Sequence, residues 1–151
     1  MAYRIINAAK RHITQLEDIE RQCFSMPWSA QQLETQLPDD RHIFIVAEDE
    51  GHVLGYVGMM YVLDEGYISN VAVRKENRKQ GIADALISAL ERECHLKELA
   101  FATLEVRAGN EPAIKLYSKH GFVPVGLRRN YYEKPSEDAI LMTKFFKGEE
   151  K

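Results

Sequence analysis

A cluster of cations in front of an expected helix is the first feature that suggests chemistry. The stretch "VAVRKENRKQGIADALI" (71–87) begins with strand-forming residues and ends with helix-forming ones, and Arg78, Lys79, Gly81 and Ala83 lie between them. The first N–H groups of a helix lack internal partners and lie at the positive end of its dipole, so this terminus binds phosphate well. Small residues there let a ligand approach the backbone. The stretch predicts a pyrophosphate site; the alternative is a solvated basic turn.

A glutamate in the middle of an expected strand is the second feature. In "AFATLEVR" (100–107), the apolar residues alternate with Thr103, Glu105 and Arg107, which therefore share the opposite face. A carboxylate in mid-strand disfavours the strand and calls for an explanation. Glu105 is a candidate general base facing a cleft, or an exposed or arginine-paired glutamate on an edge strand.

Two residues on the following segment are further candidates. Tyr117 lies near the end of an expected helix, and its phenol, with an ordinary pKa of about 10, stays protonated at neutral pH and can act as a general acid. The alternative is a core tyrosine that packs with Leu116. Asn110 is a good N-cap for the same helix, a ligand contact, or both.

The elements that position these residues follow from periodicity and punctuation. Expected strands lie at 3–9, 42–49, 52–64, 67–74, 100–107, 122–129 and 139–146. Expected helices lie at 14–23, 29–37, 79–96 and 110–120, marked by the pairs Thr14/Glu17 and Ser29/Gln32 as capping boxes, Pro112 in a first turn and Gly121 as a C′ residue. This order predicts an α/β (α+β) fold, with a mixed sheet and helices on both faces.

Composition limits the alternatives. The 151 residues and net charge of -3 predict one domain, 1–151, with no general attraction to nucleic acid. We expect a cytoplasmic protein without a signal peptide or membrane partner, because no apolar run approaches the ~20 residues of a membrane helix. Cys23 and Cys94 match no metal or redox spacing. We predict no metal, because the histidines do not cluster: His12, His42, His52, His95 and His120.

The pattern Arg78-x-x-Gly81-x-Ala83 after a strand resembles the acetyl-CoA signature [Q/R]-x-x-G-x-[G/A] of the GNAT acetyltransferase superfamily. Arginine and alanine are the less usual options at the ends of this pattern, but both are permitted. The resemblance implies a mostly antiparallel sheet of about seven strands flanked by about four helices. Strands four and five would splay apart, and acetyl-CoA would lie between them. The implied cofactor-binding residues are Val71, Ala72, Val73, Arg78, Lys79, Gln80, Gly81, Ile82, Ala83, Asp84 and Asn110.

Three further blocks narrow the resemblance. "CFSMPWS" (23–29), "LEVRAGNEPAIKLYSKHGF" (104–122) and "RRNYYEKPSEDAILM" (128–142) resemble the bacterial ribosomal-protein-alanine N-acetyltransferase family. That resemblance implies that Glu105 is the general base, that Tyr117 is the general acid, and that transfer is direct in a ternary complex. The N-terminus of a ribosomal protein would be the acceptor. It would lie between the loop after the first helix and the loop joining the last two strands.

The residues expected to line this acceptor slot are Pro27, Trp28, Tyr131 and Tyr132. For the aromatic residues, core packing or stacking at a hairpin tip is the alternative. Two other functions remain open: acetylation of a lysine side chain, polyamine or other small amine, and a non-catalytic acyl-CoA sensor. A small-amine enzyme would show an acidic pocket, and the presence of both Glu105 and Tyr117 argues against a sensor.

Overall fold

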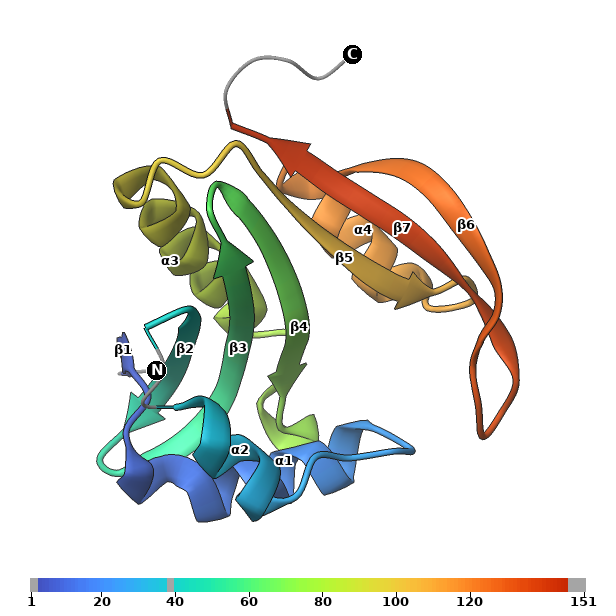
Figure 1. Ribbon diagram of the computed structural model, residues 1–151. Helices are drawn as coiled ribbons and strands as arrows, with labels where there is room; N and C mark the ends of the chain where they lie inside the picture. The colour runs from blue at the N-terminus through green and yellow to red at the C-terminus, as the bar shows by residue number, and fades with distance from the viewer. Residues whose placement is uncertain (1–2, 38–39, 147–151) are drawn as a thin grey trace.

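The computed structural model describes residues 3–37 and 40–146, which form a seven-stranded sheet flanked by helices (Figure 1). The strands are β1 (Arg4–Asn7), β2 (His42–Asp49), β3 (His52–Val62), β4 (Glu65–Val73), β5 (Phe101–Arg107), β6 (Val123–Tyr132) and β7 (Glu137–Phe145). The helices are α1 (Ile13–Cys23), α2 (Ala30–Gln36), α3 (Ile82–Leu96) and α4 (Glu111–Lys119), with short 3-10 turns η1 (Lys10–His12) and η2 (Lys75–Asn77).

The sheet is split between its fourth and fifth strands. Its spatial order is β1-β2-β3-β4-β5-β7-β6, and every neighbouring pair is antiparallel except β4 and β5. Those two parallel strands pair only between Glu65–Tyr67 and Phe101–Thr103, and then diverge (Figure 1). The predicted mixed, mostly antiparallel and splayed sheet is confirmed.

Helices cover the sheet on opposite faces, as expected. On one face of α3, Ile82, Leu86 and Leu90 follow one another at intervals of four residues and are almost fully buried in a core that reaches both halves of the sheet. On the opposite face, Leu16 of α1 and Leu33 of α2 pack into a second core. Within the described residues, no helix is long and apolar enough to cross a membrane.

Local sequence signals locate three helix ends correctly. Ser29 and Gln32 form the predicted reciprocal capping box: the Ser29 Oγ accepts from the Gln32 N–H at 3.2 Å, and the Gln32 Oε1 accepts from the Ser29 N–H at 2.9 Å. Asn110 caps α4 by accepting from the Ala113 N–H at 3.3 Å. Gly121 follows α4 at a φ of 92°, where glycine is favoured.

Other boundaries differ from the expectation. The predicted capping box of Thr14 and Glu17 is wrong, because α1 begins at Ile13 after His12 and no side chain caps it. The Glu17 carboxylate instead accepts from the Ala30 N–H at 2.9 Å, which joins α1 to the start of α2.

The cation-rich turn and the last hairpin also depart from the expected boundaries. Helix α3 begins at Ile82 rather than residue 79, because Lys79 and Gly81 adopt left-handed φ angles of 64° and 82°. Strand β6 runs to Tyr132, which pairs with Glu137, so Tyr131 and Tyr132 end a strand rather than lie in the loop.

Candidate active site

A groove of about 670 Å³ runs along the entrance of α3, beside the end of β4 and the start of α4. All the predicted cofactor-binding residues except Gln80 line it: Val71, Ala72, Val73, Arg78, Lys79, Gly81, Ile82, Ala83, Asp84 and Asn110. The fold therefore gathers a sequence motif and a distant asparagine around one space. Gln80 is exposed and is not part of this lining.

The turn before α3 leaves its backbone accessible. Gly81 is the N-cap, and a Cβ built there meets no atom within 4 Å. The Arg78 side chain turns back to the end of β4, where its Nε donates to the Val73 carbonyl at 3.0 Å and its Nη2 lies 3.3 Å from the Cys23 Sγ. Arg78 thus fixes the turn in addition to bringing positive charge to the groove.

Asp84 in the first turn of α3 introduces a negative charge beside the groove, and two residues of the α4 end balance it. Lys119 Nζ lies 2.8 Å and His120 Nε2 2.9 Å from the Asp84 Oδ1. The Lys119 ammonium lowers the pKa of Asp84, with a smaller contribution from His120. The pairing reduces the repulsion that a carboxylate would exert on a phosphate at this helix entrance.

A second cavity, of about 540 Å³, brings the two candidate catalytic residues together. Glu105 of β5 and Tyr117 of α4 both line it, and so do Val71 and Asn110, which also line the groove. Glu105 lies beyond the last β4–β5 pair, so its strand has no partner on the β4 side there. Its Oε2 accepts from the Arg128 Nε at 3.1 Å, so the arginine-paired alternative and a position facing the cleft are both realised.

Tyr117 is a core residue and a cavity-lining residue at once. Its ring packs against Phe122 at a centroid distance of 5.9 Å, and the residue is only 8% exposed. Burial, and then the nearby Tyr132 phenol, raise the pKa of Tyr117 above its ordinary value of 10. No described residue forms a hydrogen bond with its hydroxyl, so that proton is available to a ligand.

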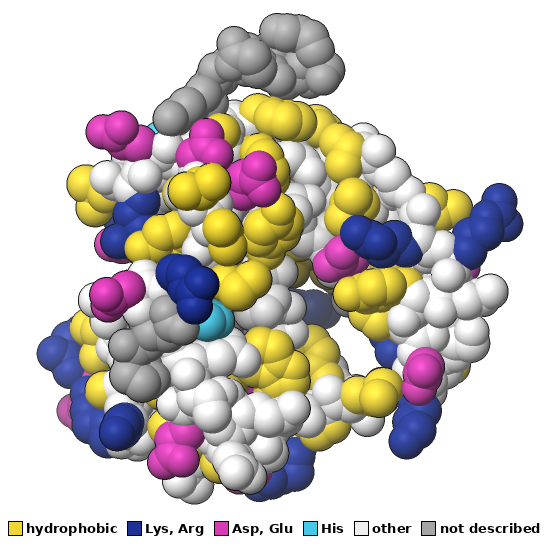
Figure 2. All heavy atoms as spheres, in the orientation of Figure 1, with side chains coloured by type: hydrophobic (Ala, Val, Ile, Leu, Met, Phe, Trp, Pro, Cys, Tyr) yellow, Lys and Arg dark blue, Asp and Glu magenta, His cyan; other side chains and the backbone are white. Residues whose placement is uncertain are grey.

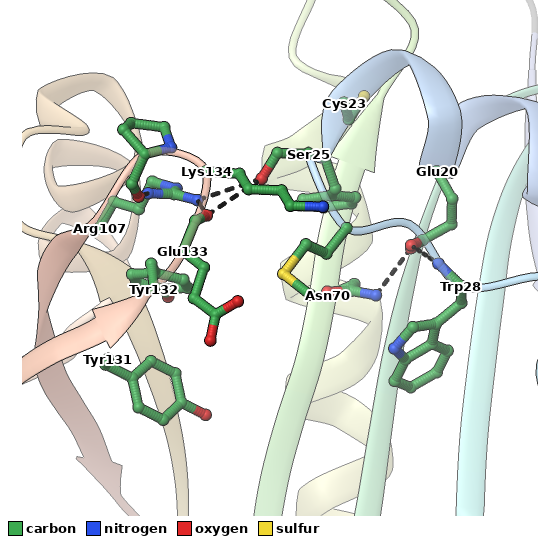
Figure 3. A pocket seen from close by; sticks show the side chains of 13 residues that line it. Glu20, Cys23, Ser25, Trp28, Asn70, Arg107, Tyr131, Tyr132, Glu133 and Lys134 are labelled. Atoms are coloured by element: carbon green, nitrogen blue, oxygen red, sulfur yellow. Dashed lines mark hydrogen bonds between the residues drawn. The ribbon is translucent and has the colours of Figure 1, made fainter.

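A third cavity, of about 570 Å³, is lined by the three aromatic residues predicted for the acceptor slot (Figure 3). Trp28 lies on the side of the α1–α2 loop, and Tyr131 and Tyr132 lie on the side of β6. The two tyrosine rings meet edge to face at 5.0 Å. Figure 2 shows a hollow between the part of the molecule that contains β1 to β4 and the part that contains β5 to β7. Pro27 is exposed in the same loop and is not part of this lining.

Glu20 is a residue of this cavity that the sequence argument missed. It is 1% exposed and accepts hydrogen bonds from the Trp28 N–H at 2.8 Å, the Asn70 Nδ2 at 2.7 Å and the Tyr56 hydroxyl. Burial raises the pKa of Glu20, and these three donors oppose that effect. Glu20 lies four residues after Leu16, on the buried stripe of α1. A carboxylate at such a position indicates hydrogen bonding inside the protein, and this was the signal available in the sequence.

The two cysteines differ in their surroundings. Cys23 lines all three cavities, whereas Cys94 is buried in the core, where desolvation raises its pKa to about 12. A thiol with this pKa is a poor nucleophile. Among residues 3–37 and 40–146, no group of three or more His, Cys, Asp or Glu side chains is arranged to hold a metal ion.

Comparison with known proteins agrees with this arrangement. Residues 13–122 match the model of the Acetyltransferase (GNAT) family. The chain is 34% identical over 137 residues to the putative [ribosomal protein bS18]-alanine N-acetyltransferase of Bacillus subtilis, covering 90% of this chain and 91% of that protein. It is 34% identical over 126 residues to the [ribosomal protein bS18]-alanine N-acetyltransferase of Escherichia coli, covering 82% and 84%.

The crystal structure of the ribosomal-protein-S18-alanine N-acetyltransferase from Escherichia coli is also similar. It superimposes with a TM-score of 0.89 at 30% identity, covering 99% of both chains. The splayed sheet, the groove at a helix entrance and the family match define an acyltransferase. The chain belongs to the GNAT acetyltransferase family and is an N-acetyltransferase that uses acetyl-CoA, as the sequence predicts.

Proposed function

We propose that this enzyme acetylates the α-amine of an N-terminal alanine, on a small-subunit ribosomal protein in the cytoplasm, by direct transfer in a ternary complex. The observation that carries the proposal is the position of the second cavity, between the cofactor groove and the aromatic slot. Glu105 and Tyr117 line it together, and it shares Asn110 with the cofactor groove and Trp28 with the aromatic slot. A donor in the groove and an acceptor in the slot would therefore meet beside both residues.

The acceptor amine needs a base. A chain α-amino group has a pKa near ~7.7–8.0, so much of it is ammonium at neutral pH and cannot attack. Glu105, directly or through water, would first take one proton from the ammonium, and the lone pair of the free amine would then attack the thioester carbonyl carbon. An acceptor ammonium would compete with the Arg128 guanidinium for the Glu105 carboxylate.

Collapse of the resulting tetrahedral intermediate breaks the C–S bond and releases the coenzyme A thiolate. The Tyr117 hydroxyl would donate to that sulfur, because it is protonated at neutral pH and has no partner among the described residues. The acetyl group ends on nitrogen, which loses two protons in all. One goes to Glu105 before the attack, and the other leaves as the intermediate collapses and restores, directly or through water, the proton that Tyr117 gives to sulfur. No step requires an acyl-enzyme, in agreement with the buried and weakly acidic Cys94.

The charges in the slot favour a peptide N-terminus over a small polyamine. Its lining includes Glu20 and Glu133 but also Arg107 and Lys134, and it is therefore not an acidic pocket. Glu20 is internally paired with three donors. The names of the relatives in Bacillus subtilis and Escherichia coli support alanine and a ribosomal protein as the acceptor.

The test is thiol release from acetyl-CoA with paired peptides. One peptide begins with free alanine and lacks lysine; the other has a blocked N-terminus and an internal lysine. We expect turnover with the first alone. Turnover only with the second would assign the acceptor to lysine and overturn the proposal. Binding of acetyl-CoA without turnover of either would redirect the search to small amines, and then to an acyl-CoA sensor.

A further inference from the structure

The two walls of the acceptor slot belong to different halves of the sheet. The α1–α2 loop sits on the half formed by β1 to β4, and the β6–β7 loop, residues 133–136, extends from the other half (Figure 1). The halves are joined in the sheet by three residues of β4 and three of β5, at the end opposite the slot. The apolar core under α3 also joins the two halves, and contacts across the slot itself fix the distance between its walls.

One side chain holds the β6–β7 loop in place. Arg107 is the last residue of β5, and its guanidinium donates to the Glu133 carbonyl at 3.1 Å and the Pro135 carbonyl at 3.0 Å. It also pairs with the Glu137 carboxylate at 3.3 Å and lies 4.4 Å from the centre of the Tyr132 ring. The loop and a tyrosine of the slot are thus tied to the strand that carries Glu105.

The same guanidinium reaches across the cleft. Its Nη2 lies 3.3 Å from the Ser25 Oγ, and that hydroxyl lies 3.5 Å from the Glu133 carbonyl oxygen (Figure 3). Arg107 and Ser25 are 82 residues apart and lie on opposite sides of the slot. Among the hydrogen bonds of the described residues, the first joins the α1–α2 loop to the end of β5, and the second joins it to the β6–β7 loop.

We propose that Arg107 is a positioning residue that sets the width of the acceptor slot. It anchors the β6–β7 loop and Tyr132 on the strand of Glu105, and it closes the open end of the cleft through Ser25. A planar guanidinium suits this task because it presents five donors in a fixed fork, whereas a lysine ammonium offers three donors from one point. Arg107 lines the aromatic slot and the cavity of Glu105 and Tyr117 but is absent from the lining of the cofactor groove, so its replacement should spare acetyl-CoA binding.

This inference rests on the proposed function only in assigning the slot to the acceptor. Arg107→Gln should raise the KM of the alanine peptide by about 10–100-fold, because a small displacement of a positioning wall has large effects. Ser25→Ala, which leaves the guanidinium in place, should raise it by about two- to tenfold through the loss of one hydrogen bond. Arg107→Lys should fall between wild type and Arg107→Gln. The Kd of acetyl-CoA and the melting temperature should change little in all three.

Arg129→Gln is the matched control, because Arg129 is a nearby exposed arginine without a hydrogen bond or ion pair to a described residue. It should leave the peptide KM unchanged. Hydrogen–deuterium exchange supplies a readout that needs no turnover: amides of residues 133–136 and of the α1–α2 loop should exchange faster in Arg107→Gln and not in Arg129→Gln.

Unchanged peptide KM and unchanged exchange in Arg107→Gln would overturn the assignment. So would an equal loss of acetyl-CoA affinity, which would show a general structural role. If the wild-type enzyme acetylates neither test peptide, the proposed acceptor is wrong, and the exchange comparison still decides whether Arg107 holds the two loops. If Arg107→Gln does not fold, an unchanged KM in both Arg107→Lys and Ser25→Ala would count against the proposal.

Discussion

At the scale of single residues, Glu105 is the side chain on which proton removal depends. Replacing it with glutamine preserves its size and an oxygen that can accept from Arg128, but removes the base. We expect kcat at pH 7 to fall by about 10²–10⁴-fold, the contribution of a positioned general base. The loss should shrink as pH rises past the pKa of the α-amine, near ~8, because more acceptor is then already deprotonated. The measurement is the pH dependence of kcat, with acetyl-CoA affinity as the control.

A pH–rate profile identical to that of the wild-type enzyme would remove Glu105 as the base. The ion pair with Arg128 makes this outcome informative, because the glutamine variant retains the local packing while losing only the charge.

Replacement of Tyr117 tests whether its hydroxyl protonates the departing thiolate. In Tyr117→Phe the ring keeps its contact with Phe122, and no hydrogen bond to a described residue is lost, so the melting temperature should stay close to that of the wild type. We expect kcat to fall by about 10²-fold or more, with the Kd of acetyl-CoA little changed, because only the proton donor is missing. Steady-state kinetics and calorimetry measure the two quantities.

Tyr67→Phe is the matched control for this substitution. It removes a phenolic hydroxyl that donates to the Glu65 carboxylate at 2.7 Å, at the end of β4 that pairs with β5 and outside the three cavities. Equal activity losses in the two variants, or full activity in Tyr117→Phe, would leave Tyr117 with a packing role alone.

At the scale of elements, the role of the α3 entrance in cofactor binding can be tested by substituting its N-cap residue, Gly81. Gly81 has a φ of 82°, so Gly81→Ala should cost about 1–2 kcal/mol of stability from the left-handed conformation alone. It would also place a methyl group at the mouth of the groove, where a pyrophosphate would approach the backbone. We therefore expect a weaker affinity for acetyl-CoA, by about tenfold or more, measured by calorimetry.

Gly51→Ala separates these two effects. Gly51, in the turn between β2 and β3, has a φ of 85° and equally open space around its Cα, but it lies away from the groove. It should lose a similar amount of stability and keep its acetyl-CoA affinity. Equal affinities in both variants would contradict the role of the helix entrance.

The elements themselves were predictable where the signal was local. Ser29 with Gln32, Asn110 with its following proline, and Gly121 each specify a helix end within four residues of sequence, and the structure has all three. The box of Thr14 and Glu17 had the same local appearance, but Glu17 forms its hydrogen bond with the start of α2 instead. A tertiary partner can thus override a capping pattern.

At the scale of the whole molecule, the residues of the candidate site that lie in a sequence motif could be predicted. The residues that meet only through contacts between distant segments could not. The cofactor turn, Glu105 and Tyr117 follow from type, spacing and resemblance. Glu20 bonds to Asn70, 50 residues away, and Arg107 meets Ser25, 82 residues away. No spacing rule connects such pairs: the packing of α1 against β4 brings the first together, and the meeting of the two halves of the sheet brings the second.

Beyond the site, the ion-pair cluster around Glu48 gives the molecule a pH dependence of stability. Glu48 of β2 is 1% exposed, just beneath the exposed side chains of Arg4 and Arg11. His12 Nδ1 accepts from the Ala9 N–H at 2.9 Å, which leaves its Nε2 to donate to Glu48 at 3.0 Å. Hydrogen bonds from Arg11 and then His12 lower the pKa of Glu48 from 4.5 to about 2. The cluster ties β1 and the η1 turn before α1 to β2.

The sign of the effect follows from that lowered pKa. A carboxylate with a folded-state pKa below its unfolded value stabilises the protein above the unfolded value, here 4.5, and its contribution is lost as pH falls towards 2. Glu48→Gln should therefore lower the melting temperature by several degrees at pH 7, and the deficit should shrink progressively between those two pH values. Glu34→Gln, on the exposed face of α2 and without a hydrogen bond or ion pair to a described residue, should track the wild type at every pH. A deficit of constant size down to pH 2 would mean that Glu48 acts through packing alone, because its charge would then make no difference to the folded state.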